Sequence, residues 1–411
     1  MTTGNAADRA NGGVDSPYAW VRLAIASVIG TIGGVGMWSY VVALPAVQAD
    51  FGIDRATASM PYTMALIGVA LSSAPMGRLA DRMGIVFPAI LSTALLAVGY
   101  VIAGYAPNIW VLNLAHLIIG VGCAGTFGPL IADMSHWFHK RRGIAIALAS
   151  CGNYLSGAVW PPILQHFIQS DGWRTTHIAV GIVCLVTMVP LSLALRRPSP
   201  VGHAAALTAG GRGTLGLQPN VLQGLLAIAG IACCVAMAMP QVHIVAYCAD
   251  LGYGTARGAE MLSVMLALGL IARVASGSIA DKIGGLAALL IGSALQAFAL
   301  LLYLGFNGLT SLYVVSGLFG LFQGGIIPMY AVIVREYFSP QEAGIRVGIA
   351  LMFALFGMAL GGWMSGAIFD LTGSYRAAFA NGFFWNLLNI AIIGWLLIRS
   401  RTWTTPKLAA A

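Results

Sequence analysis

The chain has 411 residues, of which 59% are hydrophobic and 8% are charged, and its formal net charge is +8. A soluble domain carries about 25% charged residues, so this composition excludes an ordinary soluble protein and indicates one that crosses a lipid bilayer many times. The positive residues lie between apolar segments, where membrane topology accounts for them, and we expect no nucleic-acid binding.

Apolar segments of about 20 residues, the length that crosses the hydrocarbon core of a bilayer, recur along the whole chain. The sequence predicts twelve transmembrane helices in two six-helix halves, and hence an all-α membrane protein. The expected helices cover residues 18–46, 57–76, 85–105, 109–135, 143–168, 175–195, 220–248, 258–280, 286–305, 309–334, 345–368 and 376–398.

One long polar stretch, 196–219, separates the first six predicted helices from the last six. It contains Pro198, Pro200 and several glycines, which favours a flexible linker. The first 16 residues are polar and show no apolar core with a cleavage site, so we expect no removable signal peptide. The predicted organisation is a tail at 1–17, a bundle at 18–195, a linker at 196–219, a bundle at 220–398 and a tail at 399–411.

Positive charge is unevenly distributed between the two sides of the predicted membrane. Placing the tails, the linker and alternate loops on one side collects 16 of the 21 Lys and Arg residues there and leaves four, Arg55, Arg174, Arg257 and Arg376, on the other; the remaining one, Arg273, lies inside a predicted span. Because cytoplasmic loops carry this excess, we expect both termini and the linker in the cytoplasm. A multi-pass protein of the cell's inner (plasma) membrane is the expected location.

The two halves repeat at an offset of 200 residues. The segment Gly77–Gly84 (GRLADRMG) recurs as Gly277–Gly284 (GSIADKIG), and the Gly-Trp-Arg sequence at 172–174 is echoed at 373–376. Duplicated halves are typical of transporters that rock around a central site.

The repeated segment resembles the loop signature of the major facilitator superfamily, which stands between the second and third helices, with a weaker copy between the eighth and ninth. This resemblance implies the major facilitator fold and a cytoplasmic latch that stabilises the outward-facing state. Asp133, at the end of the fourth predicted helix, is the expected partner of one of the motif's arginines. The residues assigned to the latch are Gly77, Asp81, Arg82, Asp133, Arg142, Gly277 and Asp281.

A second motif covers residues 137–157 (WFHKRRGIAIALASCGNYLSG). Its aromatic pair, basic cluster and alanine-rich helix resemble the signature between the fourth and fifth helices of the monocarboxylate transporter family. Gly152 and Gly157 would let the fifth helix pack closely against a neighbour. Residues 15–20 fit the first-helix signature of that family only loosely.

Arg273 is the one charge in the interior of the apolar run 262–282, and no acidic residue stands one helical turn away on either side. Burying an unpaired guanidinium in a bilayer costs roughly 2.5–3.5 kcal/mol on insertion scales. We hypothesise that its partner is the cargo, a small organic monoanion, because an arginine can bond both oxygens of a carboxylate. The resemblance to monocarboxylate transporters, whose eighth helix holds the substrate with an arginine, implies the same role.

The chain departs from that family in two places. Its mammalian members carry an aspartate one turn before this arginine, where this chain has Gly269, and a lysine in the first helix, which here has none. Proton coupling through those side chains therefore does not carry over. The related oxalate–formate exchangers add a second cation in the eleventh helix, whereas here that helix has no charge beyond Arg346 at its start, which favours a monoanion over a dianion.

Polar residues inside the apolar spans are the other candidates. His243 is the first candidate to bind the cargo or carry a proton, because histidine titrates near neutral pH, and His116 is the second proton-coupling candidate. For both, a ring bonded to a neighbouring backbone carbonyl is the alternative. Further substrate-binding candidates, each of which is more often a packing contact, are Tyr154, Asn153, Gln323, Tyr330, Asn386 and Asn389, with Phe127, Phe353 and Phe356 as an apolar wall.

The sequence has no Walker loop, nucleophile elbow or HExxH motif, and its six cysteines lack metal-ligand spacing. We therefore expect no enzyme activity, no ATP coupling, no cofactor and no metal. The predicted function is a monomeric secondary transporter that moves lactate- or pyruvate-like monocarboxylates, with protons as the coupled ion. The alternatives are an anion exchanger of the oxalate–formate type, a drug exporter and, outside transport, a membrane-embedded enzyme or sensor.

Overall fold

The computed structural model describes residues 13–139, 141–197 and 215–408, and the elements in these ranges are all α-helices. They are α2 (Pro17–Gly33), α3 (Val35–Phe51), α4 (Arg55–Met83), α5 (Val86–Gly104), α6 (Ile109–Gly125), α7 (Gly128–Trp137), α8 (Arg142–Ser150), α9 (Gly152–Ala194), α10 (Pro219–Asp250), α11 (Thr255–Ile283), α12 (Gly285–Gly305), α13 (Leu309–Gln323), α14 (Ile326–Tyr337), α15 (Pro340–Thr372) and α16 (Tyr375–Leu408).

Eleven described stretches are long and apolar enough to span a membrane. The longest, Ile144–Ala194, holds two of the predicted spans, because Gly172 inside α9 has φ 82° and ψ 159° and is not helical. The twelve predicted spans are therefore present, and the all-α membrane fold is confirmed. Four spans consist of two helices joined at a break, which are α2 with α3, α6 with α7, α8 with α9 and α13 with α14.

The offset of 200 residues recurs in the way the helices cross. A Cβ atom on Gly120 of α6 would lie 1.9 Å from the carbonyl oxygen of Ala65 on α4. A Cβ atom on Gly320 of α13 would lie 1.9 Å from the carbonyl oxygen of Met265 on α11. Only glycine permits two backbones to approach this closely. The crossing of the second and fourth spans is thus reproduced by the eighth and tenth.

The repeated motif ends α4 and α11 in the same conformation. Gly84 and Gly284 have φ values of 78° and 84°, a region that residues with side chains rarely adopt. Their N–H groups donate to the carbonyl oxygens of Ala80 and Ala280 at 2.9 and 2.8 Å. Each copy therefore makes the same sharp turn into the next span.

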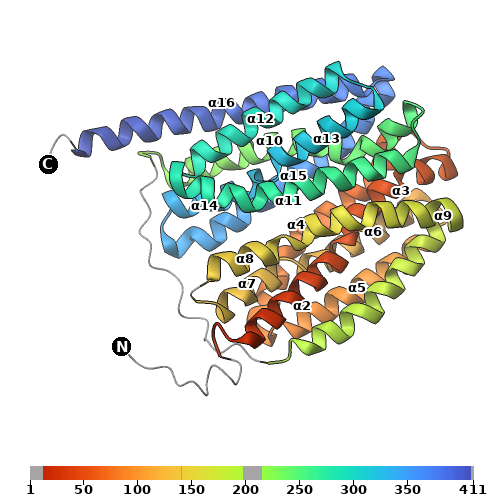
Figure 1. Cartoon of the computed structure of the whole chain (residues 1–411), viewed down its shortest axis with the longest axis horizontal. Coiled ribbons are helices and arrows are strands. Elements are labelled where there is room, and N and C mark those ends of the chain that lie inside the picture. Colours follow the sequence, from red (N-terminus) through yellow and green to blue (C-terminus); the bar gives the residue numbers. More distant parts are fainter. Residues whose placement is uncertain (1–12, 140, 198–214, 409–411) are drawn as a thin grey trace.

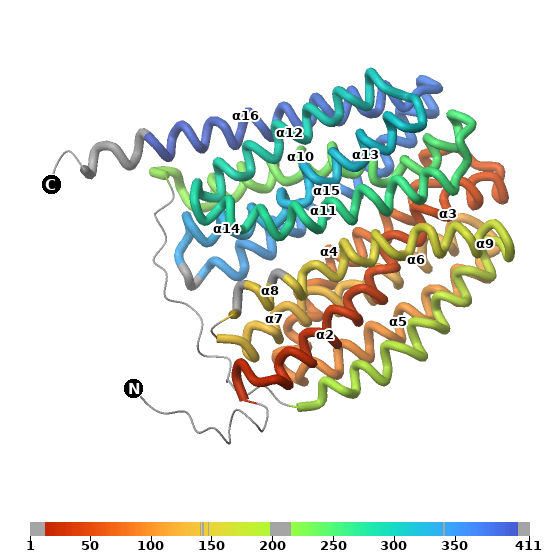
Figure 2. Tube along the Cα trace, viewed as in Figure 1, coloured from red at the N-terminus to blue at the C-terminus, as the bar shows by residue number. Residues whose placement is uncertain are grey.

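The helices form two groups, α2 to α9 and α10 to α16, which lie side by side in Figure 1. We call the side where α2 begins and α16 ends the termini side, which also holds Gly84 and Gly284, and the opposite one the far side, which holds Gly172 and Gly252. The halves contact each other mainly along α4 with α15 and α9 with α11. Figure 2 traces the chain through both halves.

Candidate functional site

Arg273 extends from α11 of the second half to the fifth span of the first half. Its guanidinium carbon lies 4.3 Å from the centre of the Tyr154 ring on α9. Its Nη1 donates to the carbonyl oxygen of Ser150, the last residue of α8, at 3.2 Å. The Nε atom is buried without a hydrogen-bond partner, and no ion pair among the described residues includes this arginine. The result is a cation at the boundary of the halves whose Nε donor no group of the described residues uses.

Gly269 lies one helical turn before Arg273 and contacts the same aromatic ring. A Cβ atom at this position would lie 2.5 Å from Cε1 of Tyr154 and 3.3 Å from the carbonyl oxygen of Gly320. A Cβ atom on Gly324, the residue that follows α13, would lie 2.1 Å from the carbonyl oxygen of Gly269. The backbone of α11 is therefore in close contact with both Tyr154 and the end of α13, with no room for a side chain at 269.

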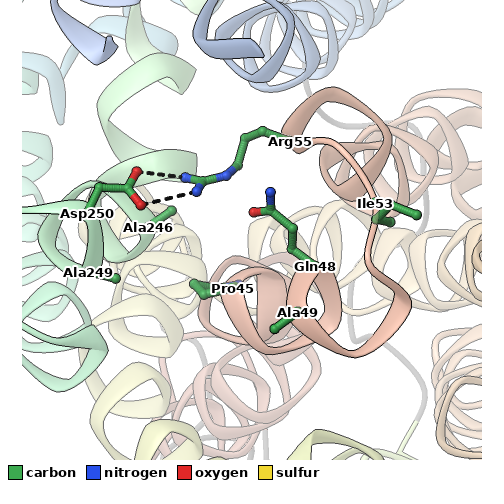
Figure 3. A pocket seen from close by; sticks show the side chains of 8 residues that line it. All are labelled: Pro45, Gln48, Ala49, Ile53, Arg55, Ala246, Ala249 and Asp250. Atoms are coloured by element: carbon green, nitrogen blue, oxygen red, sulfur yellow. Dashed lines mark hydrogen bonds and ion pairs between the residues drawn. The ribbon is translucent and has the colours of Figure 1, made fainter. Parts of the chain in front are cut away.

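On the far side, Arg55 at the start of α4 reaches across to the second half (Figure 3). Its Nη1 and Nη2 atoms donate to the carboxylate of Asp250 at 3.1 and 3.2 Å, and Nη1 also donates to the hydroxyl of Tyr375 at 2.6 Å. Asp370 accepts from the backbone N–H groups of Arg55 and Ala56 at 2.9 and 2.7 Å. Side chain and backbone of Arg55 thus join the start of α4 to α10, α15 and α16.

Two cavities flank this junction between the halves. The one beside the ion pair has a volume of about 350 Å³, and Figure 3 shows the amide of Gln48 pointing toward the Arg55 guanidinium. The second, of about 290 Å³, is lined partly by Gln165 and Thr255. Gln165 Nε2 donates to Thr255 Oγ1 at 2.7 Å. Since Thr255 stands 200 residues after Arg55, the two equivalent helix starts both bond the opposite half.

Further hydrogen bonds between the halves continue toward the middle of the spans. Thr63 donates to the carbonyl oxygen of Ala359 at 3.0 Å, and Ser263 donates to that of Ala158. Of the hydrogen bonds between the halves that the described residues form, the one from Arg273 to Ser150 lies nearest to the termini side. The halves are therefore joined from the far side down to Arg273.

Comparison with known families agrees with this architecture of paired helical halves. The sequence profile of the Major Facilitator Superfamily matches residues 26–311 and, in a second placement, 261–410. This chain belongs to the major facilitator superfamily. Monocarboxylate transporter 13 of Bos taurus is 30% identical to it over 329 residues, which cover 77% of this chain and 75% of that relative. The MFS-type transporter opdF of Penicillium oxalicum is 26% identical and covers 72% of this chain and 70% of its own length.

Solved structures of major facilitator proteins share the fold. A bacterial homologue of the human lysosomal transporter Spinster, in an inward-facing and occupied conformation, superposes with a TM-score of 0.69 at 17% identity, over 95% of this chain and 97% of that one. A variant of the nucleoside transporter NupG gives a TM-score of 0.68 at 14% identity, over 94% and 99%. At these identities the similarity shows the fold alone.

The two histidine candidates of this major facilitator protein have different surroundings. His243 is fully buried, with Nδ1 2.8 Å from the Tyr375 hydroxyl and Nε2 2.8 Å from the Gly362 carbonyl oxygen. It therefore belongs to the far-side network around Arg55, and both of its ring nitrogens have partners. His116 is also buried; its Nδ1 contacts the carbonyl oxygen of Leu112 at 2.9 Å, whereas its Nε2 has no partner.

Tyr330, Asn386 and Asn389 form one buried hydrogen-bonded cluster. The Tyr330 hydroxyl donates to Asn389 Oδ1 at 3.1 Å, and Asn389 Nδ2 donates to Ser293 Oγ at 2.7 Å. Asn386 Nδ2 donates to the carbonyl oxygen of Ser293 at 2.8 Å. These side chains join α14, α16 and α12, so their contacts are those of interhelical packing.

The remaining substrate-binding candidates lie on several helices. Gln323, at the end of α13, is fully buried, and neither amide atom has a partner. Asn153 accepts from the indole N–H of Trp38 through both its backbone and side-chain oxygens at 3.1 Å. Phe353 and Phe356 pack edge to face on α15 at 6.3 Å, and Phe127 is 36% exposed at the start of α7.

The expected partner of Asp133 was wrong. Its carboxylate accepts from Nε and Nη2 of Arg22 on α2, at 2.7 and 3.1 Å, rather than from an arginine of the repeated motif. Arg22 also donates to the carbonyl oxygens of Leu195 and Arg197 at 3.1 Å. Arg22 is only 1% exposed, and a buried guanidinium requires a counter-charge, which Asp133 provides. The bonds of Arg22 to Leu195 and Arg197 also join the end of α9 to the first span.

The other latch residues lie where the two motif copies turn. Nothing lies within 4 Å of the position that a Cβ atom would take on Gly77 or Gly277. Asp281 and Arg82 are exposed, and the side chain of Arg142 lies outside the described residues.

The sequence reasoning missed the far-side network. From the sequence, Arg55 is only one of four charges on the less positive side, Asp250 falls just beyond a predicted helix, and Tyr375 lies in the stretch that echoes residues 172–174. The available signal was the repeat itself, because Asp250 stands 200 residues after Asp50. Asp50, however, pairs with Arg174 inside the first half, so the repeat alone does not give the contact across the halves.

Proposed function

We propose that this protein is a secondary transporter that carries small monocarboxylates, such as lactate or pyruvate, by alternating access, with Arg273 binding the carboxylate. The observation that supports this most is the buried Nε of Arg273 without a partner, at the boundary of the halves. A carboxylate there would gain charge-assisted hydrogen bonds from a fork that matches its geometry. The similarity to relatives named monocarboxylate transporters agrees with an anionic cargo.

The proposed cycle places the termini side in the cytoplasm of the inner membrane, as the positive loops favour. The contacts that join the halves at the far side would then hold an inward-facing state. Reaching the outward-facing state would require Arg55 to leave Asp250 and Tyr375, while the two motif copies, with Arg142, approach each other at the termini side. We further propose that the chain acts as a monomer and that its two bundles are the rigid bodies, at 18–195 and 220–398.

A single cation at the site favours a cargo with a single negative charge. Arg273 is the one charged residue in the interior of its span, and its guanidinium lies against the face of the Tyr154 ring. A dianion would bring a second charge into this environment without a counter-charge, which is costly in a bilayer. Lactate and pyruvate satisfy the single cation, whereas oxalate does not.

Proton coupling is proposed to occur through the cargo. Both ring nitrogens of His243 already have protein partners in the far-side network, which leaves that residue without a free position for a transported proton in this state. A monocarboxylate bound to Arg273 can itself take up the coupled proton. We therefore propose symport of one proton with each anion, with the carboxylate of the cargo, rather than His243, as the proton carrier.

Uptake into proteoliposomes tests this function. Radiolabelled lactate, pyruvate, formate and oxalate would be offered with and without an inward proton gradient, to the wild type, to Arg273→Gln and to Arg257→Gln. Arg257 is a matched control because it lies on the same helix but is exposed and pairs with Glu260 at 2.9 Å. We expect lactate and pyruvate uptake that the gradient accelerates and that Arg273→Gln alone abolishes. Undiminished uptake by Arg273→Gln, or exchange restricted to oxalate and formate, would contradict the proposal.

A further inference from the structure

We propose that Tyr154 is a positioning residue for Arg273, and that Gly269 is required because the Tyr154 ring occupies the space that a side chain at 269 would take. This inference rests on the proposed function, since it concerns how the same arginine is presented to the cargo. It adds a contribution from the first half to a binding group that belongs to the second.

An arginine that binds a small anion must hold its guanidinium in one orientation, although its side chain has several rotatable bonds. Contacts from the first half hold the Arg273 guanidinium: its carbon lies 4.3 Å from the centre of the Tyr154 ring, and its Nη1 donates to the Ser150 carbonyl oxygen at 3.2 Å. An aromatic face attracts a guanidinium without neutralising its charge. The Ser150 carbonyl oxygen accepts from Nη1, whereas Nε has no partner in the described part of the chain and could donate to a carboxylate of the cargo.

The position of the Tyr154 ring is itself determined by packing. The residue is only 4% exposed, and a Cβ atom on Gly269 would lie 2.5 Å from its Cε1 and 2.9 Å from its Cδ1. The backbone of α11 is also in close contact with Gly324, the residue that follows α13, since a Cβ atom there would lie 2.1 Å from the carbonyl oxygen of Gly269. A side chain at 269 would therefore displace the ring of Tyr154 rather than its own helix.

Contact with an aromatic ring, rather than with a carboxylate, keeps the charge of Arg273 available to bind an anionic cargo. A carboxylate one turn from Arg273 would be a permanent counter-charge with which an incoming anion must compete. The Tyr154 ring supplies orientation without such competition. Because Tyr154 and Ser150 belong to one half and Arg273 to the other, this orientation exists only while the fifth and eighth spans are in contact.

A double-mutant cycle tests the inference. The KM and maximal rate of lactate uptake into proteoliposomes would be measured for the wild type, Tyr154→Ala, Gly269→Ala and the double variant. We expect each single change to raise KM about tenfold and to change the maximal rate less than about threefold. The double variant should raise KM no more than the larger single effect, because the added methyl group has no ring left to displace. Fully multiplied effects would overturn the inference.

Three further variants exclude a general packing effect. Tyr154→Phe keeps the aromatic face and should retain the wild-type KM, whereas Tyr154→Leu keeps apolar bulk without the face and should raise it. Gly258→Ala is the control on the same helix, since its Cβ would lie 2.5 Å from the Cα of Val245; it should reduce thermal stability but not alter KM. A higher KM in Gly258→Ala or in Tyr154→Phe would contradict positioning by the ring face.

The experiment separates this inference from the function on which it rests. If the wild type takes up no monocarboxylate, the proposed function fails, and the inference fails with it. If uptake requires Arg273 but Tyr154→Ala and Tyr154→Leu retain the wild-type KM, the function stands and the positioning role is wrong.

Discussion

Replacing Arg55 by Ala should open the far side of the protein. The change removes two hydrogen bonds to Asp250 and one to Tyr375, while the carboxylate of Asp370 keeps its backbone partners. Hydrogen bonds to charged groups contribute about 1.5–3 kcal/mol each when buried. Because the Asp250 side chain is 33% exposed and regains water, we expect a net loss of about 2–3 kcal/mol from the far-side-closed state.

A loss of that size would change the ratio of the two states by roughly 30- to 150-fold, since every 1.4 kcal/mol is tenfold. Spin labels at Ser170 and Asn307, which are exposed on the far side of opposite halves, would report the distance there by pulsed electron paramagnetic resonance. Labels at Met83 and Ile283 would report it at the termini side. The six native cysteines are buried and should label weakly.

Arg55→Ala should lengthen the Ser170–Asn307 distance and shorten the Met83–Ile283 distance. Arg174→Ala is the matched control, because Arg174 pairs with Asp50 on the far side but within one half. It should leave both distances at their wild-type values. Unchanged distances in Arg55→Ala, or an equal shift in Arg174→Ala, would refute the assignment of Arg55 to the closure.

Three other predictions concern packing and coupling. Asp133→Ala should lower the stability to unfolding by about 3 kcal/mol, measured by thermal denaturation in detergent, because it leaves the buried guanidinium of Arg22 without its carboxylate; a loss below about 0.5 kcal/mol would contradict this. His243→Gln should keep the wild-type lactate KM and the response of uptake to the proton gradient, and loss of that response would identify the histidine as a proton carrier after all. Gly320→Ala should cost about 1–3 kcal/mol of stability, since its Cβ would meet a carbonyl oxygen at 1.9 Å, whereas Gly348→Ala, with nothing within 4 Å, should not destabilise the protein; equal effects would show that the crossing is not tightly packed.

The fold could be predicted from the sequence because its signals are local and repeated. The length of the apolar segments predicts the transmembrane spans. The offset of 200 residues between Gly77–Gly84 and Gly277–Gly284 predicts the two halves. The same offset relates the backbone contacts of Gly120 and Gly320. These features depend on residue type and spacing, which a single sequence displays directly.

Contacts between distant residues could not be predicted in the same way. The partner of Asp133 is 111 residues away on α2, and the partner of Arg55 is 195 residues away on α10. A single sequence shows that these groups are charged but not which pairs packing brings together. The surroundings of His243 were likewise invisible, because its partners are a hydroxyl on α16 and a carbonyl on α15.

The site itself was accessible only in part. An unpaired charge in a long apolar run identified Arg273 as a candidate, since the cost of burial applies wherever the helix packs. The sequence also showed the glycine at 269, but not the reason for it, which is the ring of Tyr154 against the backbone of α11. That reason required the relative position of the fifth and eighth spans.

The binding of lactate to purified protein in lipid nanodiscs tests the central claim, which is that Arg273 holds the carboxylate of the cargo. Isothermal titration calorimetry would compare the wild type with Arg273→Gln and Arg273→Lys. The account predicts saturable binding to the wild type, binding at least tenfold weaker in Arg273→Lys, which keeps the charge but loses the fork, and none detectable in Arg273→Gln. Equal affinity in the wild type and Arg273→Gln would contradict it.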